Sequence, residues 1–240
     1  MSDKIEQSVS VPEEIPDCPQ CGKPMPLCIC DSITPLESKI ELLILMHPQE
    51  QDRLLGTARL TALHFANATL KIGLSWPSLS KALGRNVDPA RWAILYLGSS
   101  KVADLETESD IVAIDRKGGI EEGQRAIFKD LEGIVLLDGT WSQAKALWWR
   151  NAWMLKCRRV ILAPARPSLY GKLRREPRGD GLSTIEAAAM LLGRLNKSEE
   201  IEITLLGAFE RMLARYRQVQ AVTPQIAPKP KKRDWRRKRK

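Results

Sequence analysis

A run of branched and aliphatic residues that ends abruptly in polar ones constrains the fold of this chain more than any other feature. Residues 134–137 are continuously apolar, and Asp138, Gly139, Thr140 and Trp141 follow directly. Such a short apolar run is typical of a strand that is buried on both faces of a parallel sheet. In open α/β sheets, ligands bind beyond the carboxyl ends of the strands. We therefore expect Asp138 and Trp141 to lie at a ligand-binding edge.

Other apolar runs of strand length alternate along the chain with segments of helical periodicity. Strands are expected at residues 40–46, 92–97, 111–114, 134–137 and 159–162, and helices at 53–66, 122–131, 142–149, 183–195 and 201–217. This alternation is typical of a parallel sheet covered by helices on both faces. The sequence thus predicts an α/β fold with a mainly parallel sheet, whose strand order it leaves open.

Composition divides the 240 residues into four segments. Residues 1–16 are polar and expected to be disordered, 17–36 form a Cys/Pro-rich module, 38–220 form the α/β domain, and 222–240 form a basic, flexible tail. The N-terminus lacks the apolar core of a signal peptide, and no apolar run reaches the roughly 18–20 residues of a membrane helix. We therefore expect a cytoplasmic protein.

The net charge of +9 is concentrated in two regions. Residues 229–240 hold nine Lys/Arg and one acid (+8), and residues 145–178 hold ten Lys/Arg and one acid (+9), which leaves −8 for the rest. Two basic regions on an otherwise acidic chain favour a nucleic-acid partner, although a tail alone is equally explained as a solubilising end. Phosphate contacts and base stacking are expected from Lys145, Arg166, Tyr170, Lys172, Arg174, Arg175 and Arg178. For the six of these that lie between 166 and 178, a solvated loop is the alternative.

Four of the five cysteines lie within thirteen residues, as Cys18-x-x-Cys21 and Cys28-x-Cys30. In a reducing compartment, clustered cysteines favour a metal over disulfides or unligated thiols. Four thiolates fill the tetrahedral shell of zinc, so we expect a structural zinc and not a catalytic one; an iron–sulfur cluster is the alternative. Cys157 stands alone and is expected in the core.

Two polar motifs each have a structural and a functional interpretation. Asp138 is either a helix N-cap, a role that Thr140 would also fill, or a carboxylate that accepts a proton or orients a substrate. Residues 183–186 read Ser-Thr-Ile-Glu, which matches a capping box at a helix start. A helix N-terminus also binds carboxylates and phosphates, so Ser183 and Thr184 are candidate ligand contacts.

Taken in order, these motifs resemble the DTW-domain family, whose Asp–Thr–Trp signature is carried here by Asp138, Thr140 and Trp141. The resemblance covers most of residues 18–217, and the D-x-T-W and STIEA segments are specific only together. Leu97 departs from the proline-like residue expected in relatives. The other matching motifs are the four clustered cysteines, His47-Pro48, Thr57-Ala58-Arg59-Leu60 and Ser183-Thr184-Ile185-Glu186-Ala187.

The resemblance implies an activity and a fold. Bacterial members look like tRNA-uridine aminocarboxypropyltransferases, which transfer the 3-amino-3-carboxypropyl group of S-adenosylmethionine to N3 of a uridine in the tRNA variable loop and release 5′-methylthioadenosine. The fold implied is SPOUT-like, a class that can carry a trefoil knot. An RNA methyltransferase, the same transfer on ribosomal RNA, and a non-enzymatic zinc-containing RNA-binding protein are the competing interpretations.

Roles for individual residues follow from this resemblance. Asp138 is expected to take the N3 proton, Trp141 to stack on uracil or adenine, and Thr140 to complete the catalytic group. Ser183 and Thr184 would hold the methionine carboxylate of the co-substrate, and Glu186 its ammonium. The expected S-adenosylmethionine contacts are Thr57, Leu97, Gly98, Leu137, Ser183, Thr184 and Glu186.

Overall fold

Six strands form one sheet in the order β2-β1-β5-β3-β6-β4. The computed structural model describes residues 15–95, 107, 109–164, 166–174 and 181–222. The strands are β1 (Glu41–Met46), β2 (Ala68–Ile72), β3 (Trp92–Leu95), β4 (Ile111–Ile114), β5 (Gly133–Asp138) and β6 (Arg158–Leu162). Neighbouring strands are parallel, except that β4 runs antiparallel to β6. The predicted mainly parallel α/β sheet is confirmed.

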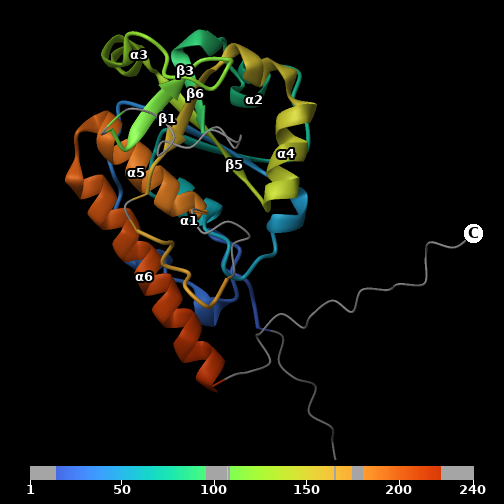
Figure 1. Cartoon of the computed structure of the whole chain (residues 1–240). Coiled ribbons are helices and arrows are strands. Elements are labelled where there is room, and N and C mark those ends of the chain that lie inside the picture. Colours follow the sequence, from blue (N-terminus) through green and yellow to red (C-terminus); the bar gives the residue numbers. More distant parts are fainter. Residues whose placement is uncertain (1–14, 96–106, 108, 165, 175–180, 223–240) are drawn as a thin grey trace, which may run out of the picture.

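Helices cover both faces of this sheet because successive residues of each strand point to opposite sides. On β1, Leu42 and Ile44 join the core under α1, α5 and α6, whereas Leu43 and Leu45 join the core under α2 and α4. Figure 1 shows the two groups of helices on opposite sides. The helices are α1 (Ala58–Leu63), α2 (Leu79–Leu83), α3 (Gln124–Asp130), α4 (Trp141–Arg150), α5 (Thr184–Asn196) and α6 (Glu199–Val222).

At the amino edge of the sheet, a glycine in β5 makes room for a tryptophan of β3. Gly133 begins β5 in register with Trp92 of β3, whose indole is fully buried. A Cβ atom at position 133 would lie 2.5 Å from an indole carbon, a contact that a packed core does not accommodate. The glycine therefore leaves space for the Trp92 ring, which packs in the core under α2 and α4.

The N-terminal cysteine segment packs onto the α/β body. It contains two short 3-10 helices, η1 (Met25–Leu27) and η2 (Cys30–Ser32), and buries Leu27 and Ile29. Arg211 of α6 donates to the Ser32 carbonyl and hydroxyl. These contacts hold the segment against α6.

The structure differs from the sequence predictions in four elements. The helix expected at 53–66 begins only at Ala58, and residues 48–50 form a separate 3-10 turn, η3 (Pro48–Glu50). Neither β2 nor α2 was predicted, and the antiparallel direction of β4 could not be predicted from the sequence. Across the described segments, none of the helices is long and apolar enough to cross a bilayer. Outside those segments lie Leu97, Gly98, Arg175, Arg178, residues 1–14 and the tail from residue 223.

Candidate functional site

The carboxyl ends of β1 and β5 lie side by side and bring two loops together. Met46, the last residue of β1, is in register with Asp138, the last residue of β5. The backbone N–H of His47 donates to the Asp138 carbonyl at 2.9 Å. This edge is where the topology of an open parallel sheet places a ligand.

Thr140, and not Asp138, caps helix α4. The Thr140 hydroxyl accepts from the Gln143 N–H, and the Gln143 side chain accepts from the Thr140 N–H at 2.6 Å, which completes a capping box. The N-cap interpretation of Asp138 is therefore wrong. Its carboxylate remains available for another role.

The Asp138 carboxylate is buried and meets the first residue of α5. The hydroxyl of Thr184 donates to Asp138 Oδ1 at 2.5 Å, and Asp138 is only 9% exposed. Burial raises the pKa of Asp138, and the hydrogen bond from Thr184 opposes that rise. A carboxylate with a raised pKa is a stronger proton acceptor than one in water.

Three further charged side chains act electrostatically on Asp138, and two of them, Glu50 and Lys23, were not predicted from the sequence. Glu50 raises the pKa of Asp138, whereas Arg174 and Lys23 lower it. Lys23 is 5% exposed and donates to the carbonyls of Leu54 and Gly56, and burial lowers its pKa to about 8. The cysteine segment thereby contributes a buried cation to the site.

Glu50 is an acid in η3, directly beyond the carboxyl end of β1. It is 4% exposed, and its Oε1 accepts no hydrogen bond from the described residues. Arg53 lies 3.5 Å from Oε1, and Arg174 lies 3.9 Å from Oε2. A buried carboxylate oxygen that accepts no hydrogen bond lowers the stability of the fold, unless a bound ligand supplies the hydrogen-bond donor. Glu50 follows the apolar run of β1 closely, as Asp138 follows the apolar run at 134–137, and this was the signal that could have identified it.

The carboxylate of Glu186 already accepts hydrogen bonds from the protein itself. Its oxygens accept from Ser183 N–H at 2.8 Å, Ser183 hydroxyl at 2.6 Å, Ser168 hydroxyl at 2.7 Å and Leu169 N–H at 2.7 Å. In this structure the Glu186 carboxylate and the Ser183 hydroxyl are thus already engaged within the protein, and the expected binding of an ammonium by Glu186 and of a carboxylate by Ser183 stays a prediction. The pair forms the capping box of α5 and fastens the loop at 168–169 onto it.

Tyr170 is a packed residue and not a stacking platform. It is 1% exposed, its hydroxyl donates to the Leu55 carbonyl at 2.6 Å, and its ring meets Phe209 of α6 edge-on. Its expected role in base stacking is therefore wrong. The Arg174 guanidinium lies 5.4 Å from the centre of the Tyr170 ring, which places this cation beside the site.

The remaining predicted residues divide between the site and the surface. Thr57 is buried, and its hydroxyl accepts from the Ile185 N–H at 3.3 Å, which joins the start of α1 to α5. Leu137 and Trp141 are half-buried near the end of β5. Thr140, Lys145, Arg166 and Lys172 are exposed. The structure thus brings together Asp138, Thr184 and Thr57, and places Lys145 apart on α4.

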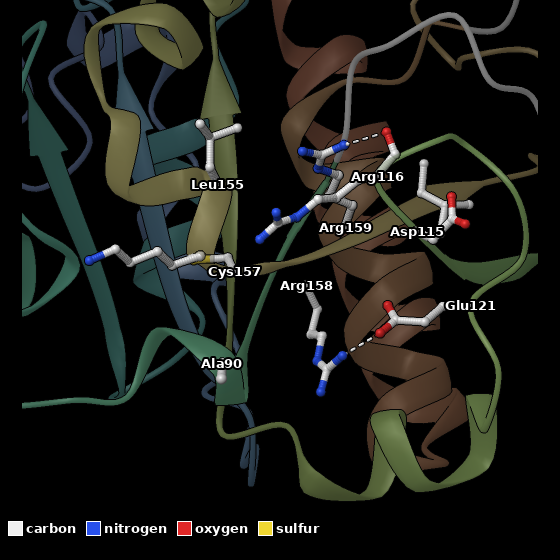
Figure 2. A pocket seen from close by; sticks show the side chains of 10 residues that line it. Ala90, Asp115, Arg116, Glu121, Leu155, Cys157, Arg158 and Arg159 are labelled. Atoms are coloured by element: carbon white, nitrogen blue, oxygen red, sulfur yellow. Dashed lines mark hydrogen bonds and ion pairs between the residues drawn. The ribbon is translucent and has the colours of Figure 1, made fainter.

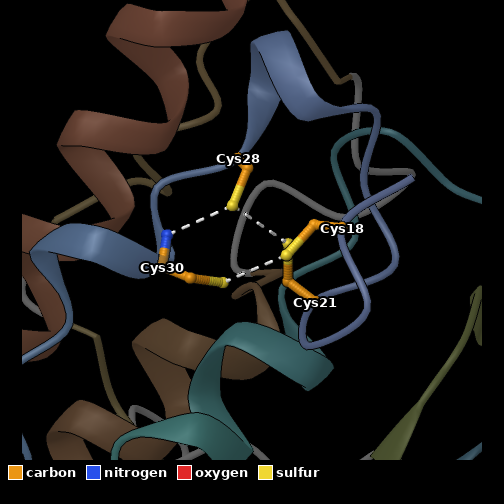
Figure 3. Close-up of side chains that lie close together, drawn as sticks. All are labelled: Cys18, Cys21, Cys28 and Cys30. Atoms are coloured by element: carbon orange, nitrogen blue, oxygen red, sulfur yellow. Dashed lines mark hydrogen bonds between the residues drawn. The ribbon is translucent and has the colours of Figure 1, made fainter. Parts of the chain in front are cut away.

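The side chains of the four clustered cysteines converge on one point (Figure 3). Their sulfur atoms all lie within 4.8 Å of one another, with Cys18 and Cys30 at 3.8 Å and Cys21 and Cys28 at 3.9 Å. A tetrahedral zinc with bonds of about 2.3 Å separates its sulfur ligands by about 3.8 Å. Sulfurs at these distances are not joined by disulfides, and the donor set fits a metal ion. Cys157 is buried elsewhere, as expected.

Comparisons with known proteins agree with these motifs. The tRNA-uridine aminocarboxypropyltransferase 2 of Mus musculus is 30% identical over 201 residues, which are 81% of this chain and 61% of that protein. The protein of the same name from Drosophila melanogaster is 28% identical over 210 residues (85% and 76%), and tRNA-uridine aminocarboxypropyltransferase A of Arabidopsis thaliana is 26% identical over 220 residues (82% and 79%).

The chain spans about three fifths of the length of the mouse relative. No solved structure matches it. The family model for the DTW domain matches residues 15–217, which include the cysteine cluster, the Asp138 strand end and the start of α5. The chain therefore belongs to the DTW domain family.

Proposed function

We propose that this protein transfers the 3-amino-3-carboxypropyl group of S-adenosylmethionine to N3 of a uridine in the variable loop of tRNA. The observation that carries the proposal is the buried Asp138 carboxylate, with its raised pKa, at the carboxyl edge of the sheet in a DTW-domain chain. The names of the relatives support the reaction and the tRNA substrate.

Asp138 acts as the general base in this proposal. The uridine N3–H gives its proton to the carboxylate while N3 forms a bond to the γ-carbon of the aminocarboxypropyl group. The bond between that carbon and sulfur breaks, its electron pair stays on sulfur, and neutral 5′-methylthioadenosine leaves. S-adenosylmethionine supplies a sulfonium, which is already a good leaving group. Orientation by the protein then matters more than acid catalysis.

The charges around Asp138 suit the two ends of the transferred group. Glu50, with its unsatisfied buried oxygen, replaces Glu186 as the acceptor for the ammonium. Arg174 is the candidate for the carboxylate because its guanidinium lies at the same edge. Thr184 is a positioning residue that fixes the Asp138 oxygen at 2.5 Å.

Other groups complete the proposed site and its surroundings. Trp141 stacks on a base, and Thr57, Leu137, Leu97 and Gly98 contact the adenosine. Zinc at the four cysteines stabilises the segment that carries Lys23, and the reduced thiols suit a cytoplasmic location. We also propose that the fold is SPOUT-like. Phosphates are bound by Lys145, Arg166, Lys172, Arg175, Arg178 and the tail.

Labelled co-substrate tests the reaction. The full chain is incubated with unmodified tRNA transcript and S-adenosylmethionine labelled either in the aminocarboxypropyl group or in the methyl group. We expect the first label in the RNA and the second in methylthioadenosine. Methyl label in the RNA would instead identify a methyltransferase. If tRNA takes up neither label, the proposal of a tRNA substrate fails, and ribosomal RNA is tested in the same way.

A further inference from the structure

Helix α4 presents a stripe of aromatic and basic side chains that begins at the proposed catalytic edge. Trp141, Lys145 and Trp149 are spaced by four residues, so they follow one another along one face of the helix. Trp149 is 80% exposed, and Lys145 is also exposed. A helix of ten residues is about 15 Å long, so the stripe extends well beyond the site of reaction.

Helix α4 and the 3-10 helix η6 (Ala152–Lys156) that follows it carry cations without acidic partners. Within the described part of the chain, no carboxylate pairs with Lys145, Arg150 or Lys156, all of which are exposed. The sequence from 139 to 175 holds nine Lys/Arg and no Asp or Glu. A solvated protein surface normally mixes both signs, whereas a surface of one sign attracts a polyanion.

The surface leads to a basic pocket at the amino ends of β3 and β6 (Figure 2). The pocket has a volume of about 370 Å³, and Lys156 lines it. Figure 2 shows Arg158 paired with Glu121 and Arg159 donating to the Arg116 carbonyl. Four Lys/Arg and two acids line the pocket, which leaves it net positive.

We propose that an unpaired segment of the substrate tRNA lies along α4, with a base stacked on Trp149 and its phosphates on Lys145, Arg150 and Lys156. The proposal rests on the proposed function, because the stripe starts where the uridine would react. Stacking on an exposed indole accepts any base, and the flanking ammonium and guanidinium groups neutralise the backbone. The surface thus positions the RNA next to Asp138 without reading its sequence.

Substitutions on this surface test the proposal in the full chain. The variants are Trp149→Ala, Trp149→Phe and the triple change of Lys145, Arg150 and Lys156 to Ala. A matched triple change to Ala removes Lys129, Arg215 and Arg217, which are exposed on α3 and α6 over the other face of the sheet. Affinity for unmodified tRNA transcript is measured at several salt concentrations, together with affinity for S-adenosylmethionine and the KM for tRNA.

We expect Trp149→Ala to weaken tRNA binding about tenfold or more and to raise KM, while Trp149→Phe retains most of the affinity. The triple variant should reduce the slope of log affinity against log salt by about 2–3, and the matched triple should leave most of it intact. Equal losses in the two triple variants would show nonspecific charge attraction and overturn the proposal.

Two outcomes separate this proposal from the proposed function. If the wild-type protein modifies tRNA and the α4 variants bind tRNA as tightly as it does, the α4 surface is not the RNA contact, although the function stands. If the wild type binds tRNA through α4 but transfers no aminocarboxypropyl group, the reaction fails while the contact stands. If the wild type binds S-adenosylmethionine but not tRNA, both proposals fall.

Discussion

Replacing Glu186 with Gln discriminates between a structural clamp and a ligand contact. In the structure the carboxylate accepts four hydrogen bonds, from Ser183, Ser168 and Leu169. Hydrogen bonds to a charged acceptor contribute about 1.5–3 kcal/mol each, against about 0.5–1.5 kcal/mol for neutral pairs. The amide of Gln also turns one acceptor into a donor that faces an N–H or O–H group.

From these differences we expect Glu186→Gln to lower the free energy of unfolding by about 3 kcal/mol. For a domain of this size that corresponds to a fall in Tm of about 6–12 °C. Thermal unfolding followed by circular dichroism measures it, alongside calorimetric titration with S-adenosylmethionine at a temperature where the variant is folded. Glu210→Gln is the control, because Glu210 is an exposed acid on α6 and its change should cost less than about 0.5 kcal/mol.

An unchanged Tm together with a large loss of S-adenosylmethionine affinity would refute this reasoning. That result would mean that the four hydrogen bonds exchange readily for a ligand ammonium. The clamp account predicts the opposite pattern, a large loss of stability with a smaller effect on affinity at low temperature.

Three further predictions concern stability and metal binding. Burial raises the pKa of Asp138, so the folded state loses stability as the pH rises from the unfolded-state pKa of about 3.9 through the raised pKa. At neutral pH, Asp138→Asn should therefore have a higher Tm than the wild type. Equal Tm values at that pH would contradict this prediction. Elemental analysis should find one zinc per chain, and Cys21→Ser should lower this zinc content whereas Cys157→Ser should not. Equal zinc contents in the two variants would exclude the four-cysteine site. Gly133→Ala should lower the free energy of unfolding, measured by chemical denaturation, by about 1–3 kcal/mol because its methyl group would clash with the Trp92 ring. An unchanged free energy of unfolding would show that the indole moves aside.

The buried strands were predictable because a strand that is buried on both faces consists of consecutive apolar residues. The predicted strand at 111–114 has the bounds of β4, and the run at 134–137 lies within β5. Strand β2 escaped because it is an edge strand with partly exposed side chains, so no apolar run marks it. The direction of β4 depends on its pairing with β6, which no local pattern specifies.

The candidate site was predictable in its motifs but not in its contacts. Asp138 and Thr184 are 46 residues apart, and only the fold reveals that one donates to the other. Tyr170 lies in a basic, loop-like stretch that suggests exposure, yet tertiary packing against Phe209 buries it. For residues 183–186 the local capping pattern was sufficient, because the side chain of Glu186 bonds within its own turn.

The single-turnover rate of aminocarboxypropyluridine formation tests the central claim most directly. Wild-type protein and Asp138→Asn are each saturated with S-adenosylmethionine and unmodified tRNA transcript, and the nucleosides are quantified by mass spectrometry over a range of pH. The account predicts formation by the wild type, a wild-type rate that falls when Asp138 becomes protonated, and a loss of about 10²–10⁴-fold in the folded variant. A near-wild-type rate for Asp138→Asn, with the same pH profile, would contradict the account.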